Sequence, residues 1–87
     1  MQKSFEELWN KLKSKSEKDK YGLEVAEDIS NIIEQIIYTR VRKSITQLKL
    51  AELTGLKLST IAKMEHMEEL PTLDVIVKVA HALGLQI

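Results

Sequence analysis

Two short amphipathic segments joined across a single glycine constrain the fold of this chain most. The first segment begins at Thr46, the second runs from Leu58 to Glu65, and Gly55 lies between them. Thr46 is a favourable helix N-cap, because its hydroxyl can accept a hydrogen bond from the amides of the first turn. Gly55 can adopt the left-handed conformation that ends a helix at no steric cost. The sequence therefore predicts two short helices joined by a tight turn.

The second of these segments has one apolar face and one polar face. Ile61 and Met64 share one side of the expected helix, and Ser59, Thr60 and Lys63 share the other. The apolar side can pack while the polar side contacts a partner. In a helix-turn-helix, the N-terminal part of the second helix reaches base edges in the major groove of DNA. Lys63, one turn further on, would reach a phosphate or a guanine edge.

A wider set of residues has the spacing of a known family. In chain order these residues are Arg40, Thr46, Gln47, Leu50, Ala51, Gly55, Ser59, Thr60, Ile61, Glu65 and Pro71. Their pattern resembles the Xre family of lambda-repressor-like helix-turn-helix proteins, and the resemblance extends from about Ile36 to Leu85. Within it, the segment from Leu56 to Leu85 is most similar to HigA-type antitoxins, which repress their own promoter and bind a partner toxin.

The resemblance implies a fold and a role for individual residues. The expected fold is an all-α, lambda-repressor-like DNA-binding domain of about five helices with an extra N-terminal helix. The expected DNA-contacting residues are Gln47, Lys49, Lys57, Leu58, Ser59, Thr60 and Lys63. Arg40 and Glu65 are expected to form a structural pair that holds the recognition helix, and so to make no DNA contact.

Gln47 and Leu58 have more specific expected contacts. Gln47 opens its helix, where its side chain and the nearby amides can meet a phosphate at the positive end of the helix; the alternative is that it only faces solvent. Leu58 would contact a thymine methyl group. The chain also departs from the family pattern, since Met67 replaces a usual glycine and Glu68 and Glu69 lie in a loop that is often basic. Two carboxylates beside DNA would repel its phosphates.

The distribution of charge supports nucleic-acid binding better than the net charge does. The formal net charge is zero, which by itself does not favour a phosphate-binding protein. From Ile36 to Lys63, however, six basic residues stand against one acid, Glu52. The basic residues are Arg40, Arg42, Lys43, Lys49, Lys57 and Lys63. This cluster indicates a phosphate-facing surface, and the alternative of ordinary solvated helix faces stays open.

The N-terminal part has an organisation of its own. Ser4 and Glu7 form a capping-box pattern, after which Phe5, Leu8, Trp9 and Leu12 recur at helical spacing. Residues 13–22 are polar and rich in lysine, as in a solvated connection. We therefore divide the chain into residues 1–22, an N-terminal amphipathic helix and polar linker, and residues 23–87, an Xre-type domain whose core is about 36–85.

A long apolar stripe follows this connection. It consists of Val25, Ile29, Ile32, Ile33, Ile36, Ile37 and Val41, and it predicts a helix of about five turns. The stripe holds more isoleucine than packing on one side requires. Either the N-terminal helix covers the surplus within the monomer, or the surplus is an interface with a second copy or a toxin. A last amphipathic helix is predicted after Pro71, ending at Gly84. The residues expected to close the core from this helix are Leu73, Ile76, Val77, Ala80 and Leu83.

Several classes of protein are excluded by what the sequence lacks. Eighty-seven residues make one domain, and the absence of cysteine excludes disulfides and thiolate metal sites. His66 and His81 are too far apart in sequence, without other ligand-type residues nearby, to suggest a metal site. No nucleophile–base pattern or glycine-rich phosphate loop is present, so no enzyme activity or cofactor is expected. With no signal peptide or membrane span, a cytoplasmic location is expected.

These observations predict a sequence-specific DNA-binding transcriptional regulator, which we expect to be an autoregulating repressor. Its expected partners are double-stranded DNA carrying an inverted-repeat operator and a second copy of the chain, because a two-fold dimer matches a two-fold site. The alternative is an antitoxin-type protein-interaction module that neutralises a toxin and binds DNA weakly or not at all.

Overall fold

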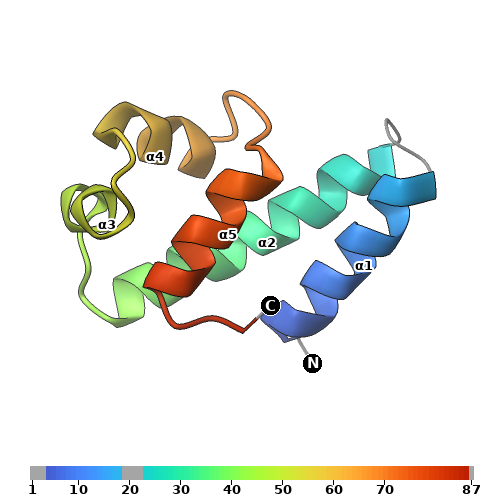
Figure 1. The fold of residues 1–87 in the computed structure, drawn as a ribbon, viewed down its shortest axis with the longest axis horizontal. Coiled ribbons are helices and arrows are strands. Elements are labelled where there is room, and N and C mark those ends of the chain that lie inside the picture. Colours follow the sequence, from blue (N-terminus) through green and yellow to red (C-terminus); the bar gives the residue numbers. More distant parts are fainter. Residues whose placement is uncertain (1–3, 19–22, 87) are drawn as a thin grey trace.

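The chain folds into helices packed around one core. The computed structural model describes residues 4–18 and 23–86. Over these residues it contains five helices and no strand: α1 (Phe5–Lys18), α2 (Leu23–Arg42), α3 (Gln47–Thr54), α4 (Leu58–Glu65) and α5 (Leu73–Ala82) (Figure 1). The predicted all-α class is therefore confirmed. No helix in the described part of the chain is long and apolar enough to cross a membrane.

Helix α1 folds back along α2 (Figure 1). Its start is capped as the sequence predicts, since the Ser4 hydroxyl accepts a hydrogen bond from the Glu7 amide at 3.2 Å. The four apolar side chains of its inner face, Phe5, Leu8, Trp9 and Leu12, are all buried. Of the two explanations for the surplus isoleucines, cover by the N-terminal helix within the monomer thus accounts for a large part of the stripe.

The prediction of a polar linker at residues 13–22 is wrong for residues 13–18, which are helical. Helix α1 continues through Lys18, and residues 19–22 lie outside the described part of the chain. The segment that follows Leu12 contains lysine, serine and glutamate but no glycine or proline until Gly22. None of these residues stops a helix that is already formed, and a polar composition alone does not distinguish an exposed helix from a loop.

The core gathers residues from all five helices. Its members include Ile32 and Ile36 of α2, Leu50 of α3, Ile61 of α4 and Ile76 of α5, each with no exposed surface. Helix α2 packs against α1 and α4, and α3 packs against both α4 and α5, so the helices are linked around this core; in the view of Figure 1, α2 passes behind α5. Because α3 and α4 each contribute buried residues, their orientation is set by this shared core.

Helix α5 closes the core with partly different residues from those predicted. It is capped by the Thr72 hydroxyl, and after its end Gly84 adopts the left-handed conformation with φ of 75°. Val79 is fully buried although it was not among the predicted core residues, whereas Leu73 is 45% exposed. Val79 follows Ile76 at helical spacing and faces the same side.

Candidate nucleic-acid interface

Helices α3 and α4 form the two-helix unit predicted around Gly55. The Thr46 hydroxyl accepts from the Lys49 amide at 3.0 Å, and Gly55 has φ of 75° with its amide donating to the Ala51 carbonyl. The Thr54 hydroxyl completes the turn: it donates to the Leu50 carbonyl at 2.8 Å and accepts from the next-but-one amide at 3.2 Å. Local capping therefore ends α3 and allows the chain to reverse within three residues.

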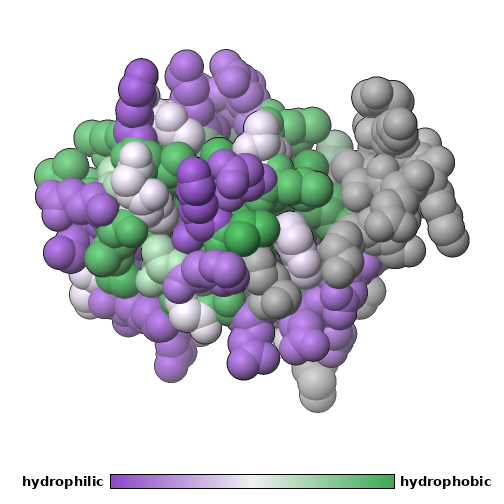
Figure 2. Space-filling model, in the orientation of Figure 1, coloured by the Kyte–Doolittle hydropathy of each residue, from purple (hydrophilic) through white to green (hydrophobic). Residues whose placement is uncertain are grey.

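Helix α4 presents the two faces expected from its sequence. Ile61 and Met64 are buried in the core, while Ser59 and Lys63 are exposed and Thr60 is half-buried. In the view of Figure 2, hydrophilic side chains project along the edge formed by α4 and the loop that follows it. The buried face prevents the helix from rolling, so the polar face is presented in one fixed direction.

The N-terminal end of α4 is open to solvent. Lys57 occupies the N-cap position without a side-chain cap hydrogen bond, and both Lys57 and Leu58 are exposed. The first amides of a helix that lack a capping side chain can bind an anion such as a phosphate. Leu58 is 45% exposed, which makes an apolar side chain available beside this polar end.

A cluster centred on Glu65 fixes α4 to the two preceding helices. Arg40 of α2 donates to both carboxylate oxygens of Glu65, from Nε at 2.7 Å and from Nη2 at 2.8 Å. The side chains are 13% and 6% exposed, respectively. The third guanidinium nitrogen, Nη1, donates to the Ile45 carbonyl in the turn before α3 at 2.9 Å. One arginine thus joins α2, the following turn and the end of α4.

Gln47 has a different environment from the one expected. Its side-chain nitrogen donates to Oε1 of Glu65 at 3.0 Å, so the side chain is part of the same cluster instead of pointing to solvent. The physical reason is tertiary: the core brings the start of α3 against the end of α4, where the Glu65 carboxylate accepts a third hydrogen bond. A phosphate contact at this point would therefore come from the first-turn amides of α3.

Lys49 and Lys63 lie in exposed ion pairs. Lys49 is 3.8 Å from Glu52, and Lys63 is 4.0 Å from Glu69, with all four side chains more than half exposed. Exposed pairs of this kind contribute little to stability and exchange readily for another partner. Both ammonium groups are thus accessible to phosphate, although Glu69 competes for Lys63.

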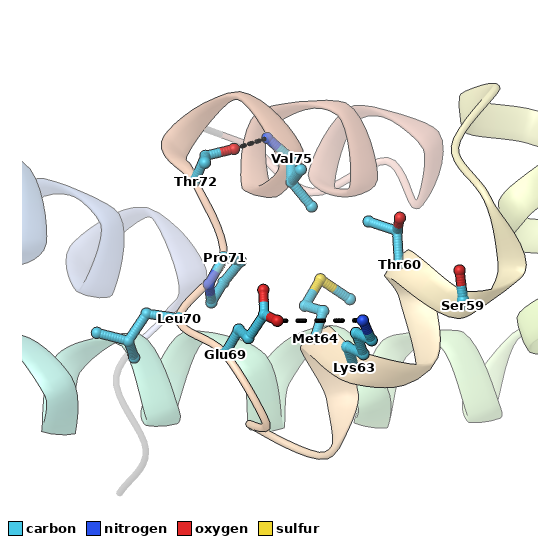
Figure 3. A pocket seen from close by; sticks show the side chains of 9 residues that line it. All are labelled: Ser59, Thr60, Lys63, Met64, Glu69, Leu70, Pro71, Thr72 and Val75. Atoms are coloured by element: carbon cyan, nitrogen blue, oxygen red, sulfur yellow. Dashed lines mark hydrogen bonds and ion pairs between the residues drawn. The ribbon is translucent and has the colours of Figure 1, made fainter.

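The polar face of α4 borders an open pocket of about 240 Å³ (Figure 3). Ser59, Thr60 and Lys63 line it from α4, and the loop before α5 lines it from the other side. Lys63 points across the pocket toward Glu69 of that loop. The structure therefore brings together three of the predicted DNA-contacting residues and places one acid among them.

The basic cluster of the sequence is divided by the fold. Arg40 is neutralised by Glu65, which lies just beyond the counted segment, and Lys43 donates to the Leu83 carbonyl at 2.6 Å. The Arg42 guanidinium lies 5.8 Å from the centroid of the Tyr38 ring. The exposed lysines of the α3–α4 unit are Lys49, Lys57 and Lys63. Counting charges along the sequence did not separate Arg40 and Lys43 from the exposed lysines, because the partners of these two residues, Glu65 and Leu83, are distant in sequence.

The glycine position of the family pattern has a structural explanation here. Met67, which replaces the usual glycine, has φ of 55°, in the left-handed region that favours glycine. The next amide, that of Glu68, donates to the Lys63 carbonyl at 3.1 Å and so ends α4. Met67 thus adopts a backbone conformation that glycine takes without strain, and its half-buried side chain packs on the core.

The comparisons with known proteins agree with this geometry. A family model described as helix-turn-helix, HTH_3, matches residues 36–87, which is more than half of the chain. No match was found among curated proteins or among solved structures. Among the described residues no group of three His, Cys, Asp or Glu side chains is arranged as metal ligands would be. The chain belongs to the HTH_3 family of helix-turn-helix DNA-binding regulatory domains.

Proposed function

We propose that this protein is a cytoplasmic, sequence-specific repressor that binds as a homodimer to an inverted repeat upstream of its own gene. The observation that carries the proposal is the division of α4: Ile61 and Met64 are locked in the core while Ser59 and Lys63 are exposed on the other face. A rigidly held helix with an exposed polar N-terminal half is the element that enters the major groove.

Base recognition is assigned to the first two turns of α4. The Ser59 and Thr60 hydroxyls can donate to or accept from base edges, and Lys63 can donate to guanine. Leu58, which is 45% exposed, offers an apolar contact for a thymine methyl group. These four residues would determine the operator sequence.

Phosphate binding is assigned to residues that flank the base-reading turns. Lys49 and Lys57 are exposed on either side of the turn at Gly55. The backbone amides at the start of α3, beside Gln47, add neutral donors. Such contacts set the register of the protein on the duplex and make its affinity dependent on salt.

The test is a binding measurement on the DNA upstream of the protein's own gene. We would compare the wild type with the Thr60→Ala/Lys63→Ala variant and with Lys78→Ala, which removes an exposed lysine of α5, using fluorescence polarisation. Saturable binding by the wild type and by Lys78→Ala, lost in the double variant, is the expected result. Equal affinity for a scrambled duplex would contradict the proposal.

A second candidate function, neutralisation of a toxin, is favoured by a separate surface. Leu70 is 56% exposed and Leu73 is 45% exposed, next to the exposed acids Glu68 and Glu69 of the loop before α5. An apolar patch rimmed by acids is suited to a protein partner more than to DNA. A salt titration separates the two functions, because only DNA binding weakens steeply as counterions compete.

A further inference from the structure

The last turns of α2 carry an apolar face that the monomer leaves open. Ile37, Tyr38 and Val41, flanked by Glu34 and Arg42, line a shallow cavity of about 430 Å³. Tyr38 and Val41 are 58% and 60% exposed. Helix α1 covers the earlier part of α2, and the last turns extend past it toward α3 (Figure 1). The isoleucine-rich stripe therefore has a covered part and an open part.

Two side chains of opposite charge lie at equal distances in sequence from Tyr38. Glu34 lies four residues before Tyr38, and Arg42 lies four residues after it. Residues spaced by three and four positions share one side of a helix, so these charges stand at opposite ends of the apolar surface formed by Ile37, Tyr38 and Val41. One end is acidic and the other end is basic.

We propose that a second copy of this chain docks on this face, with the two α2 helices antiparallel and the two-fold axis passing beside Tyr38. In this arrangement Glu34 lies opposite Arg42 of the partner subunit, and the same contact occurs a second time by symmetry. The apolar side chains between the two ion pairs are buried against their symmetry mates.

Charge complementarity identifies the partner as a second copy. A face with one acidic and one basic end matches its own antiparallel copy at both ends, which is the requirement for an isologous interface. Arg42 is also held in place before docking, because its Nη1 donates to the Tyr38 hydroxyl at 3.1 Å. A side chain that is already ordered loses less entropy when the interface forms.

The small size of the face predicts a weak dimer in the absence of DNA. Five residues from each subunit form less than a standard protein interface, so the dimer population should rise with protein concentration. This inference rests on the proposed function, in which a two-fold dimer occupies two half-sites. Binding to one half-site then raises the effective concentration of the second subunit at the other.

The test uses charge reversal and mixing, in sedimentation equilibrium without DNA. Glu34→Arg places arginine opposite arginine at both contacts, and Arg42→Glu places glutamate opposite glutamate, so each variant should dimerise at least about tenfold more weakly than the wild type. In an equimolar mixture of the two variants, both contacts become complementary, and dimerisation should return. Glu6→Arg, the same charge change on α1, should dimerise like the wild type.

Each other outcome overturns the proposed interface. A wild type that stays monomeric at every concentration, variants that dimerise normally, or a mixture that stays monomeric would each do so. A different protein partner on this face would give no recovery on mixing. Circular dichroism of each variant verifies the fold. If the mixture recovers but the wild type shows no operator preference, the interface stands and the proposed DNA function fails.

Discussion

The guanidinium of Arg40 and the carboxylate of Glu65 form two parallel hydrogen bonds, at 2.7 and 2.8 Å, across twenty-five positions of sequence. The pair is largely buried, and Gln47 supplies the carboxylate with a third donor. It connects the end of α4 to α2 and to the start of α3. The direction in which α4 presents Ser59 and Thr60 therefore depends on two largely buried residues that are not themselves assigned a DNA contact.

Loss of this pair should destabilise the protein more than loss of any surface ion pair. We expect Glu65→Ala to lower the free energy of unfolding by about 3 kcal/mol, because it leaves the Arg40 charge buried without its partner. Arg40→Lys should cost about 1–2 kcal/mol, since an ammonium cannot reproduce the two-pronged contact. Urea unfolding measures both. Glu52→Ala, which breaks the exposed pair with Lys49, is the control and should cost under about 0.5 kcal/mol.

At two turn positions with positive φ, glycine should give a more stable fold than a residue with a side chain. Gly55 has φ of 75° and open space around it, so Gly55→Ala should cost about 1–2 kcal/mol through backbone strain alone. Ser44 has φ of 57° and an exposed side chain, so Ser44→Gly should stabilise the fold by up to about 1 kcal/mol. Thermal unfolding followed by circular dichroism would show this. A stabilising Gly55→Ala would contradict the assigned backbone geometry.

At Met67, the cost of the left-handed backbone conformation can be separated from the contribution of side-chain packing. Both Met67→Ala and Met67→Gly remove the half-buried side chain, but only glycine relieves the left-handed strain at φ of 55°. We expect the glycine variant to be more stable than the alanine variant by about 0.5–1 kcal/mol, the reverse of their order inside a helix. Denaturant unfolding of the two variants measures this difference. If the alanine variant is the more stable, as it would be inside a helix, the backbone at this position is not strained.

Neutralising Glu69 should strengthen DNA binding. Glu69→Gln releases Lys63 from its 4.0 Å ion pair and removes a negative charge beside the pocket lined by Ser59 and Thr60. The affinity for operator DNA should rise, and the slope of log affinity against log salt should steepen by about one unit. Fluorescence polarisation over a salt series tests this. Glu6→Gln, on α1, should leave both quantities unchanged.

Removal of the Trp9 side chain should destabilise the fold strongly, because this residue of α1 is only 8% exposed and α1 packs along α2. Trp9→Ala is expected to cost about 3–5 kcal/mol, and Trp9→Phe substantially less, since phenylalanine keeps most of the buried volume. Urea unfolding followed by circular dichroism compares them. A cost below about 1 kcal/mol for alanine would mean that α1 does not pack on α2 in solution.

The helices and their ends were readable from sequence to a large extent. Thr46, Gly55 and Gly84 act through contacts with residues a few positions away, so their capping roles follow from local chemistry. The faces of α4 follow from helical periodicity in the same way. The end of α1 could not be predicted in this way, because the polar residues 13–18 are compatible with both an exposed helix and a loop.

The sequence alone thus determined where the helices of the described residues lie, apart from the end of α1, together with the turn at Gly55 and the polar face of α4. All of these depend on interactions between near neighbours. Only the tertiary structure decided that Gln47 joins Arg40 and Glu65, that Lys43 binds the end of α5, and that α1 covers the early part of α2 but leaves Tyr38 and Val41 open. These arrangements depend on which distant side chains the shared core brings together, and no local pattern specifies that packing.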